Sequence, residues 1–219
     1  MIVFDNVTYR YHYEQFELFK SLSFTLCDGV NTILCGEQGG KSSICKLLCN
    51  QITPQSGKIT IDGIQCNATQ DNGVLWLPQN PTFFDNRSVA YNIAYPLKVR
   101  KVVKEQRDII ARQLAEQFNL PFNVKVKQIT DEQKHTLAVA RGLAVDRKVV
   151  LFDDFFVTKQ HLIQTLELFP DAIKVELTSN TSLATGNVVV IDCGECIFQG
   201  DTEQAIAKCD GIVSIIKEQ

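Results

Sequence analysis

Gly36-Glu37-Gln38-Gly39-Gly40-Lys41-Ser42-Ser43 is the stretch that decides the fold of this chain. A strand-like segment from Asn31 to Cys35 precedes it, and the segment from Lys41 to Asn50, with apolar residues on one helical face, follows it. A glycine-rich loop between a strand and a helix lets backbone amides and the helix N-terminus surround a polyphosphate. In that arrangement Lys41 reaches the β- and γ-phosphates and Ser42 binds Mg²⁺. The stretch therefore predicts a phosphate-binding loop.

The loop is one residue shorter than the usual pattern. That pattern has four residues between the first glycine and the Gly-Lys pair, whereas three residues separate Gly36 from Gly40. A glycine-rich strand-to-helix turn without a ligand is the alternative interpretation. A second motif favours the phosphate loop, because the apolar run Val149 to Phe152 ends in Asp153 and Asp154. An aspartate at the tip of a buried strand can hold the water shell of Mg²⁺, the alternative being acids that only face solvent.

Strand-like and helix-like segments alternate along the chain, which predicts a layered α/β core. The start is rich in β-type alternation, and from Asn80 onward the period becomes helical, so we expect a helical insert between core elements. The predicted strands are Ile2 to Tyr9, Leu22 to Cys27, Asn31 to Cys35, Lys58 to Asp62, Val149 to Phe152, Ile173 to Leu177 and Val188 to Ile191. Besides the helix from Lys41, helices are predicted at Val103 to Asn119 and Asp131 to Val145.

Composition and charge exclude several classes of partner. The 22 basic and 25 acidic residues give a formal net charge of -3, and no dense Lys/Arg run indicates a nucleic-acid interface or a polybasic membrane patch. We therefore expect no nucleic acid partner. No apolar run approaches the roughly 20 residues that would span a bilayer, and Asp5 interrupts the opening apolar stretch, unlike a signal peptide. We expect a cytoplasmic protein.

Eight cysteines are scattered through apolar patterns in a chain too long to need disulfides, so we expect reduced thiols. Cys193-Gly194-Glu195-Cys196 has CxxC spacing, for which metal or redox chemistry is the alternative interpretation. No second pair with this spacing accompanies it in the sequence. The pattern therefore favours ordinary thiols.

The order of features along the chain resembles the ATPase domain of ABC transporters, from about Val3 to Ile206. Besides the glycine loop and the acidic strand end, Gln79 in Leu77-Pro78-Gln79-Asn80 falls at the Q-loop of that family. Ile129-Thr130-Asp131-Glu132-Gln133 matches its signature motif, Thr178-Ser179 its H-loop, and Val188 to Gly200 its closing hairpin. The segment Ser88 to Arg100 looks like the stretch after the Q-loop in members docked against a membrane coupling helix.

The resemblance implies a P-loop NTPase-type layered α/β core with an N-terminal antiparallel β subdomain and an inserted α-helical subdomain. We expect a single ABC-type domain over residues 1–219, with the core at 1–79 and 146–219 and the helical subdomain at 80–145. It implies ATP and Mg²⁺ as cofactors. It also implies two partners on the cytoplasmic face of a membrane, a permease subunit and a second ATP-binding subunit.

Site roles are carried over residue by residue. The nucleotide-binding residues implied are Tyr11, stacking on adenine, and Gly36, Glu37, Gln38, Gly39, Gly40, Lys41, Ser42 and Ser43. Those implied for Mg²⁺ are Ser42, Gln79 and Asp153, and those for catalysis Gln79, Asp154 and Ser179. The residues implied to face the nucleotide of the second subunit are Thr130, Asp131, Glu132 and Gln133. Alternatives stay open: Tyr11 as an ordinary strand aromatic, Gln79 as a plain loop residue, and Asp131 with Glu132 as favourable charges at a helix N-terminus.

Several departures from the family concern hydrolysis more than binding. Asp131 and Glu132 replace the two signature glycines, and their carboxylates would repel a triphosphate. Asp154 stands in place of a glutamate general base and is one methylene shorter, and Ser179 replaces the H-loop histidine. The D-loop aspartate is absent from Phe155 to Gln160. We expect weak or absent intrinsic hydrolysis and a heterodimer with a partner that supplies a working signature.

Three hypotheses of function can be compared on the sequence. The leading hypothesis is an ATP-binding subunit that couples ATP binding, and impaired hydrolysis, to a separate membrane permease. The alternative is a pseudo-ATPase that acts as a structural or regulatory nucleotide-binding module, which the shortened loop favours. A soluble phosphate-loop enzyme such as a kinase would need a second substrate site, and no residues suggest one. The transported substrate and the direction of transport cannot be read from this chain.

Overall fold

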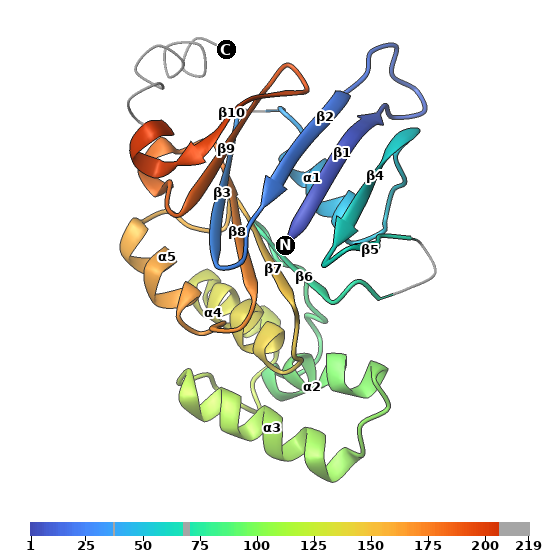
Figure 1. Ribbon diagram of the computed structural model, residues 1–219. Helices are drawn as coiled ribbons and strands as arrows, with labels where there is room; N and C mark the ends of the chain where they lie inside the picture. Colours follow the sequence, from blue (N-terminus) through green and yellow to red (C-terminus); the bar gives the residue numbers. More distant parts are fainter. Residues whose placement is uncertain (37, 68–70, 206–219) are drawn as a thin grey trace. The chain divides into compact units, whose positions relative to one another are not determined.

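The computed structural model describes residues 1–36, 38–67 and 71–205 (Figure 1). Glu37 and Ile206 lie outside the described residues. The chain divides into two compact units, Met1–Gln79 with Lys148–Gln219, described up to residue 205, and Asn80–Arg147. The first unit carries two sheets, and the second is helical. The mixed α/β architecture with a largely parallel sheet confirms the predicted fold class.

The first sheet is antiparallel, with strand order β2-β1-β4-β5. Its register places Phe4 opposite Phe24 on one side and Ile59 on the other, and the rings of Phe4 and Phe24 stack with centroids 4.4 Å apart. Alternating buried residues along β1 turn one face of this sheet toward the core. The strands are β1 (Ile2–Tyr9), β2 (Phe19–Leu26), β4 (Ser56–Ile61) and β5 (Ile64–Gln65).

The second sheet has the order β10-β9-β3-β8-β7-β6. All neighbours are parallel except β10, which pairs with β9 as the predicted closing hairpin. Parallel strands have their carboxyl ends at one edge of the sheet, so the loops after β3, β6, β7 and β8 meet there. The strands are β3 (Val30–Cys35), β6 (Val74–Pro78), β7 (Val149–Asp153), β8 (Ile173–Thr178), β9 (Asn187–Asp192) and β10 (Glu195–Asp201).

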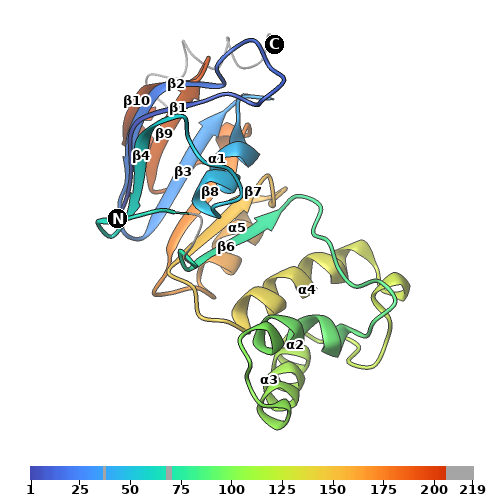
Figure 2. The ribbon, with the colours of Figure 1, turned by 90° about the vertical axis from the view of Figure 1, so that its right-hand side faces the viewer.

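Helix α1 (Lys41–Leu48) lies between the two sheets, and its buried residues Ile44, Leu47 and Leu48 belong to a core that includes residues of both (Figure 2). The face of the second sheet that carries Phe152 packs against a different aromatic group. The ring of Phe152 lies 4.9 Å from that of Phe156 and 6.1 Å from that of Phe169. Helix α5 (Lys159–Leu166) and the 3₁₀ turn η2 (Thr181–Leu183) complete the described part of this unit.

The second unit contains α2 (Val89–Val99), α3 (Lys104–Gln117), the 3₁₀ turn η1 (Val126–Gln128) and α4 (Asp131–Leu143). Fully buried Val89, Ile93 and Leu137 belong to its core. Ala111 and Ala115 are the buried residues of α3, whereas Ile110, Leu114 and Phe118 are only partly buried beside them. Small residues occupy the centre of this contact because they let helices approach closely.

Several predicted boundaries were wrong by a few residues. The chain becomes helical at Val89 rather than at Asn80, where Ser88 accepts a hydrogen bond from the amide of Tyr91 as a side-chain cap. Helix α1 ends at Leu48 because Asn50 is left-handed, with φ 56°, and the Gln51 amide donates to the carbonyl of Lys46. The patterns gave no prediction for β6 or α5. Within the described residues no helix is long and apolar enough to span a membrane.

Candidate functional site

The glycine loop joins the end of β3 to the start of α1 as a tight turn. The Gly39 amide donates to the Gly36 carbonyl at 3.1 Å, and Gln38 adopts φ 61°. Gly40, at φ 96°, forms the N-cap of α1, and a Cβ there would lie 2.7 Å from the ring of Phe19. Among the described residues no side chain caps α1 by a hydrogen bond, so the amides of its first turn are available to an anion. Glu37 lies outside the described residues.

Lys41 lies across this turn. Its side chain is 10% exposed, and Nζ donates to the carbonyl oxygens of Cys35 at 3.3 Å and Gly36 at 3.2 Å. Nζ also forms an ion pair of 3.4 Å with Oδ2 of Asp154. The ammonium is therefore held over the loop by one carboxylate and two carbonyl dipoles, where a phosphate could replace any of them.

The acidic end of β7 contacts the start of α1 directly. Asp153 Oδ2 accepts hydrogen bonds from Ser42 Oγ at 2.8 Å and from Trp76 Nε1 at 3.3 Å. Burial raises the pKa of Asp153, while these two hydrogen bonds oppose the rise. Asp154 is left-handed, with φ 47°, and its amide donates to the carbonyl of Leu177 at 2.9 Å. This kink directs the two carboxylates differently, Asp153 toward Ser42 and Asp154 toward Lys41.

A pocket of about 660 Å³ connects these groups. It brings together most of the predicted nucleotide and catalytic residues from α1 and from the loops after β1, β3, β6, β7 and β8. Gly36 and Gly39 belong to the turn behind it and line a neighbouring pocket. The lining residues are Tyr11, Leu18, Gln38, Gly40, Lys41, Ser42, Ser43, Lys46, Gln79, Asp154, Phe156, Val157, Thr178, Ser179 and Asn180.

Tyr11 is anchored to α1. Its hydroxyl and Ser43 Oγ are 2.8 Å apart, Lys46 Nζ lies 3.4 Å from the same hydroxyl, and its ring packs edge-on against Tyr9. The ring therefore lies at the rim of the pocket, half-buried, with a cation beside it at 5.6 Å from the centroid. An aromatic ring at a pocket rim can stack on a flat base.

Three residues of this region were not predicted from the sequence. Trp76 contacts Asp153 and Lys46 contacts Tyr11, while Glu176 of β8 is fully buried. The position of Trp76 three residues before Gln79, on an apolar segment ahead of the Q-loop, was the available signal for the first. Lys46 and Glu176 carry no local pattern, because their places depend on which elements pack together.

Mg²⁺ prefers oxygen ligands. The residues here offer the Ser42 hydroxyl, the Asp153 carboxylate and the side-chain amide oxygen of Gln79, which lines the same pocket as Ser42. Ser42 and Asp153 already lie in contact, so the residues present fit the ion. When bound together with a nucleotide, Mg²⁺ would partly neutralise the charge of the phosphates. The Asp153 carboxylate and the Ser42 hydroxyl would hold it from the protein side.

The predicted signature residues belong to the helical unit. Thr130 and Gln133 form a capping box at the start of α4: Thr130 Oγ1 accepts from the Gln133 amide at 3.2 Å and Gln133 Oε1 accepts from the Thr130 amide at 3.1 Å. Asp131 accepts a hydrogen bond of 2.8 Å from Lys134, which lowers the pKa of that carboxyl. Glu132 is exposed. Asp131 and Glu132 thus lie in the first turn of α4, where negative charge is favourable.

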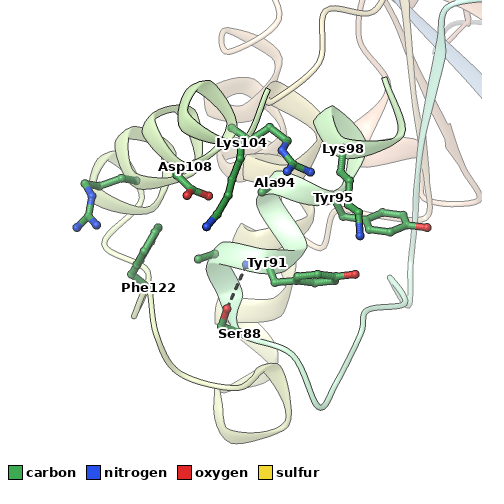
Figure 3. Close-up of a pocket in the computed structure, with 11 residues that line it drawn as sticks. Ser88, Tyr91, Ala94, Tyr95, Lys98, Lys104, Asp108 and Phe122 are labelled. Carbon is green, nitrogen blue, oxygen red and sulfur yellow. Dashed lines mark hydrogen bonds between the residues drawn. The ribbon is translucent and has the colours of Figure 1, made fainter. Parts of the chain in front are cut away.

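A second pocket, of about 390 Å³, lies in the helical unit between α2 and α3 (Figure 3). Tyr91, Tyr95 and Phe122 supply aromatic walls, and Ser88 caps the helix at its edge. Basic side chains surround them, with Asp108 as the acidic lining residue; the cations are Lys98, Lys104, Arg107 and Arg112. The surface is mixed aromatic and basic in character.

The CxxC pair lies at the turn between β9 and β10, with Cys193 exposed and Cys196 half-buried. Neither cysteine forms a disulfide, and neither do the five other described cysteines. No group of three or more potential metal-ligating His, Cys, Asp or Glu residues occurs in the described ranges. That the cysteines are reduced thiols stays a prediction.

A family model described as ABC transporter matches residues 19–157, more than half of the chain. Among curated proteins, the molybdate/tungstate import ATP-binding protein WtpC of Thermococcus kodakarensis is 33% identical over 149 residues, 66% of this chain and 45% of the relative. The ATP-dependent lipid A-core flippase of Xylella fastidiosa strain Temecula1 is 27% identical over 99% of this chain and 40% of its own length. The chain thus spans less than half the length of these two curated relatives.

Two solved structures share the fold. A bacterial Atm1-family ABC exporter with ATP bound superposes with a TM-score of 0.79 at 23% identity, covering 99% of this chain and 41% of the exporter. CbiO1 from Clostridium perfringens, part of the ABC transporter complex cbiONQ, gives a TM-score of 0.79 at 17% identity over 98% of this chain and 93% of its own. At these identities the likeness concerns the fold alone.

Proposed function

This chain belongs to the ABC transporter family, and we propose that it is an ATP-binding subunit that binds ATP with Mg²⁺ and moves a separate membrane permease. The observation that carries the proposal is the convergence of Lys41, Ser42 and Asp153 at the uncapped start of α1. A cation, a hydroxyl and a carboxylate at a free helix N-terminus are the groups that a magnesium triphosphate needs.

The pocket supports a definite placement of the nucleotide. The phosphates would lie on the glycine loop, where Lys41 exchanges its contacts with the loop carbonyls for phosphate oxygens. The base would lie near Tyr11, which Ser43 and Lys46 hold at the rim. Gln79 and Ser179 line the same pocket and would flank the outer phosphate. In this proposal Gln79 senses the outer phosphate and Mg²⁺, and its loop passes that state to the permease.

Intrinsic hydrolysis should be slow. Asp154 would have to accept a proton from the attacking water, but its carboxylate pairs with Lys41 and its side chain is short. Ser179 offers no imidazole near the outer phosphate. The capping box at α4 uses the amides of Thr130 and Gln133, and Asp131 and Glu132 add negative charge where a facing subunit's triphosphate would bind.

These features favour a heterodimer in which a second ATP-binding subunit supplies a working signature. The pair would assemble on the cytoplasmic face of a membrane, each subunit a single domain with a helical subdomain. The alternative is a pseudo-ATPase that holds nucleotide as a structural or regulatory module. The pairing of Asp154 with Lys41 and the replacement at Ser179 favour that alternative. A gene for a membrane permease and one for a second ATPase beside this one would favour the transporter subunit.

Thermal unfolding of the purified chain with and without Mg·ATP tests binding. A ligand at about 100 times its Kd should stabilise the folded chain by roughly 2.7 kcal/mol. Lys41→Ala should abolish the shift, while Lys58→Ala, at an exposed lysine paired with Asp5, should keep it. No shift in the unaltered chain would refute nucleotide binding. Brisk turnover in a radiolabelled ATPase assay of the chain alone would contradict impaired hydrolysis.

A further inference from the structure

Glu176, in the middle of β8, is a buried acid without a hydrogen-bond partner among the described residues. Its exposed fraction is 0%, and within the described residues neither carboxyl oxygen has a hydrogen-bond partner. An unpaired polar group costs free energy when it leaves water, and an ionised one costs far more. An apolar residue at this position would avoid that cost, so the acid calls for a functional explanation.

Its place in the sheet puts Glu176 behind the candidate site. It pairs in register with Phe152 of β7 and Thr32 of β3. One residue beyond Phe152, β7 ends at Asp153, which Asp154 follows, and two residues beyond Glu176, β8 ends at Thr178, which lines the pocket. Glu176 therefore lies on the strand beside Asp153 and Asp154, near enough for their charges to act on its carboxyl group.

This clustering decides the protonation state of Glu176. Burial first, and then the charges of Asp154 and Asp153, raise the pKa of Glu176 to about 9. At neutral pH the side chain is therefore the neutral acid. A carboxyl group that is held neutral by its surroundings is a recurrent feature of functional sites.

Other titratable groups around Glu176 leave this state intact. Lys174, on the same strand and face, directs its ammonium to the carbonyls of Phe169 at 2.8 Å and Pro170 at 3.1 Å. Burial raises the pKa of the Cys45 thiol on α1 well above its usual value, so that group is neutral too. The remaining charged or titratable groups on the surrounding elements are Cys35 on β3, Asp153 at the end of β7 with Asp154 after it, Lys41 and Lys46 on α1, and Lys159 and His161 on α5.

We propose that Glu176 is a third acidic residue of this site and that nucleotide binds to the form of the chain in which Glu176 carries a proton. This inference rests on the proposed nucleotide binding. If Glu176 loses its proton to solvent, the site gains a third negative charge, which repels a polyphosphate. By linkage, a bound nucleotide must then hold the proton more tightly on Glu176. The proton acts as a co-ligand, and Glu176 as a positioning residue that keeps the site receptive.

The dissociation constant of Mg·ATP, measured between pH 7 and pH 9.5, tests the inference. In the unaltered chain it should rise by roughly fourfold at pH 9.5, as one linked proton with a pKa near 9 requires. Glu176→Gln keeps the shape of the neutral acid and should bind equally well at pH 7 with a smaller rise at pH 9.5. The matched control Glu167→Gln changes an exposed acid beyond α5 and should behave as the unaltered chain. Equal pH dependence in the unaltered chain and Glu176→Gln overturns the inference.

Calorimetry of the unaltered chain provides a test that needs no variant to fold. Titrations with Mg·ATP at pH 8.5, in two buffers of different ionisation enthalpy, should reveal uptake of a fraction of a proton on binding, and at pH 7 no uptake by Glu176. Binding without proton uptake at pH 8.5 would contradict the role of Glu176 and leave the proposed function standing. Absence of binding at every pH would instead refute the proposed function.

Discussion

Ser42 and Asp153 lie 111 positions apart in the chain and are joined by a hydrogen bond of 2.8 Å from the serine hydroxyl to the aspartate carboxylate. The contact joins the first turn of α1 to the tip of β7. A hydroxyl and a carboxylate at this distance can exchange their mutual bond for Mg²⁺ or its water shell. The bond therefore marks where we expect the ion to bind.

Ser42→Ala should reduce the gain in ATP affinity that Mg²⁺ provides by roughly tenfold, since a hydrogen-bonding group next to a charge is worth about 1.5 to 3 kcal/mol. ATP binding without Mg²⁺ should change little. The measurement is the Kd of ATP with Mg²⁺ and with a chelator. Ser43→Ala is the matched control, because that hydroxyl contacts Tyr11 instead. An unchanged Mg²⁺ gain in Ser42→Ala would rule out the assignment.

Trp76 should report on the site by fluorescence. It is the only tryptophan of the chain, and its Nε1 donates to the carboxylate of Asp153 at 3.3 Å. Because Mg·ATP would draw that carboxylate toward the ion, the emission of Trp76 should shift or change in intensity on binding. Asp153→Asn should suppress the change, whereas Asp171→Asn, at an exposed loop position, should not. If saturating Mg·ATP leaves the emission of Trp76 unchanged, that result would contradict this arrangement.

Gly40→Ala should destabilise the fold by about 2 to 5 kcal/mol. The estimate combines roughly 1 to 2 kcal/mol for a left-handed alanine with about 1 to 3 kcal/mol for overpacking, since the new Cβ would meet Phe19 at 2.7 Å. Gly29→Ala is the matched control, with φ 91° and no atom within 4 Å, and should cost only the backbone part. Urea unfolding of both variants gives the comparison. Equal losses would show that Phe19 does not confine the loop.

The stability of the chain should fall as pH rises, because of Glu176. The pKa of this acid is raised from 4.5 to about 9 in the folded chain, so the folded state binds more protons than the unfolded state between these values. The free energy of unfolding therefore decreases across this window, by up to about 1.4 kcal/mol per pH unit from this group, and the loss is complete above pH 9.

Glu176→Gln should remove that part of the slope, as urea unfolding at pH 6, 7, 8 and 9 would measure. The variant should be more stable than the unaltered chain at pH 9, and the difference should shrink as the pH falls toward 6. Glu167→Gln, at an exposed acid, should retain the slope. If the two variants show the same dependence on pH, Glu176 is not buried as a neutral acid.

Local patterns were sufficient where a segment's own residues decide its structure. The strand before the glycine loop, the helix after it and the apolar runs of β7, β8 and β9 were predicted within a few residues. The predicted ends of α1 and α3 fall just beyond the observed ones, because Asn50 and Asn119 take left-handed conformations that their sequence only permits. Helix α5 lacked a clear stripe, and β6 became a strand through its pairing with β7.

The sequence by itself determined the family, the α/β class and most residues of the pocket, because the glycine loop and the acidic strand end are local motifs in a known order. Tertiary structure alone decided which groups meet. It brought Trp76 to Asp153 and paired Lys41 with Asp154. Among the described residues it left Glu176 without a hydrogen-bond partner, although Lys174, two residues earlier, donates to backbone carbonyls. Strand alternation predicts the face on which a side chain lies, but the burial, partners and charge of that side chain depend on residues that the fold brings from far along the chain.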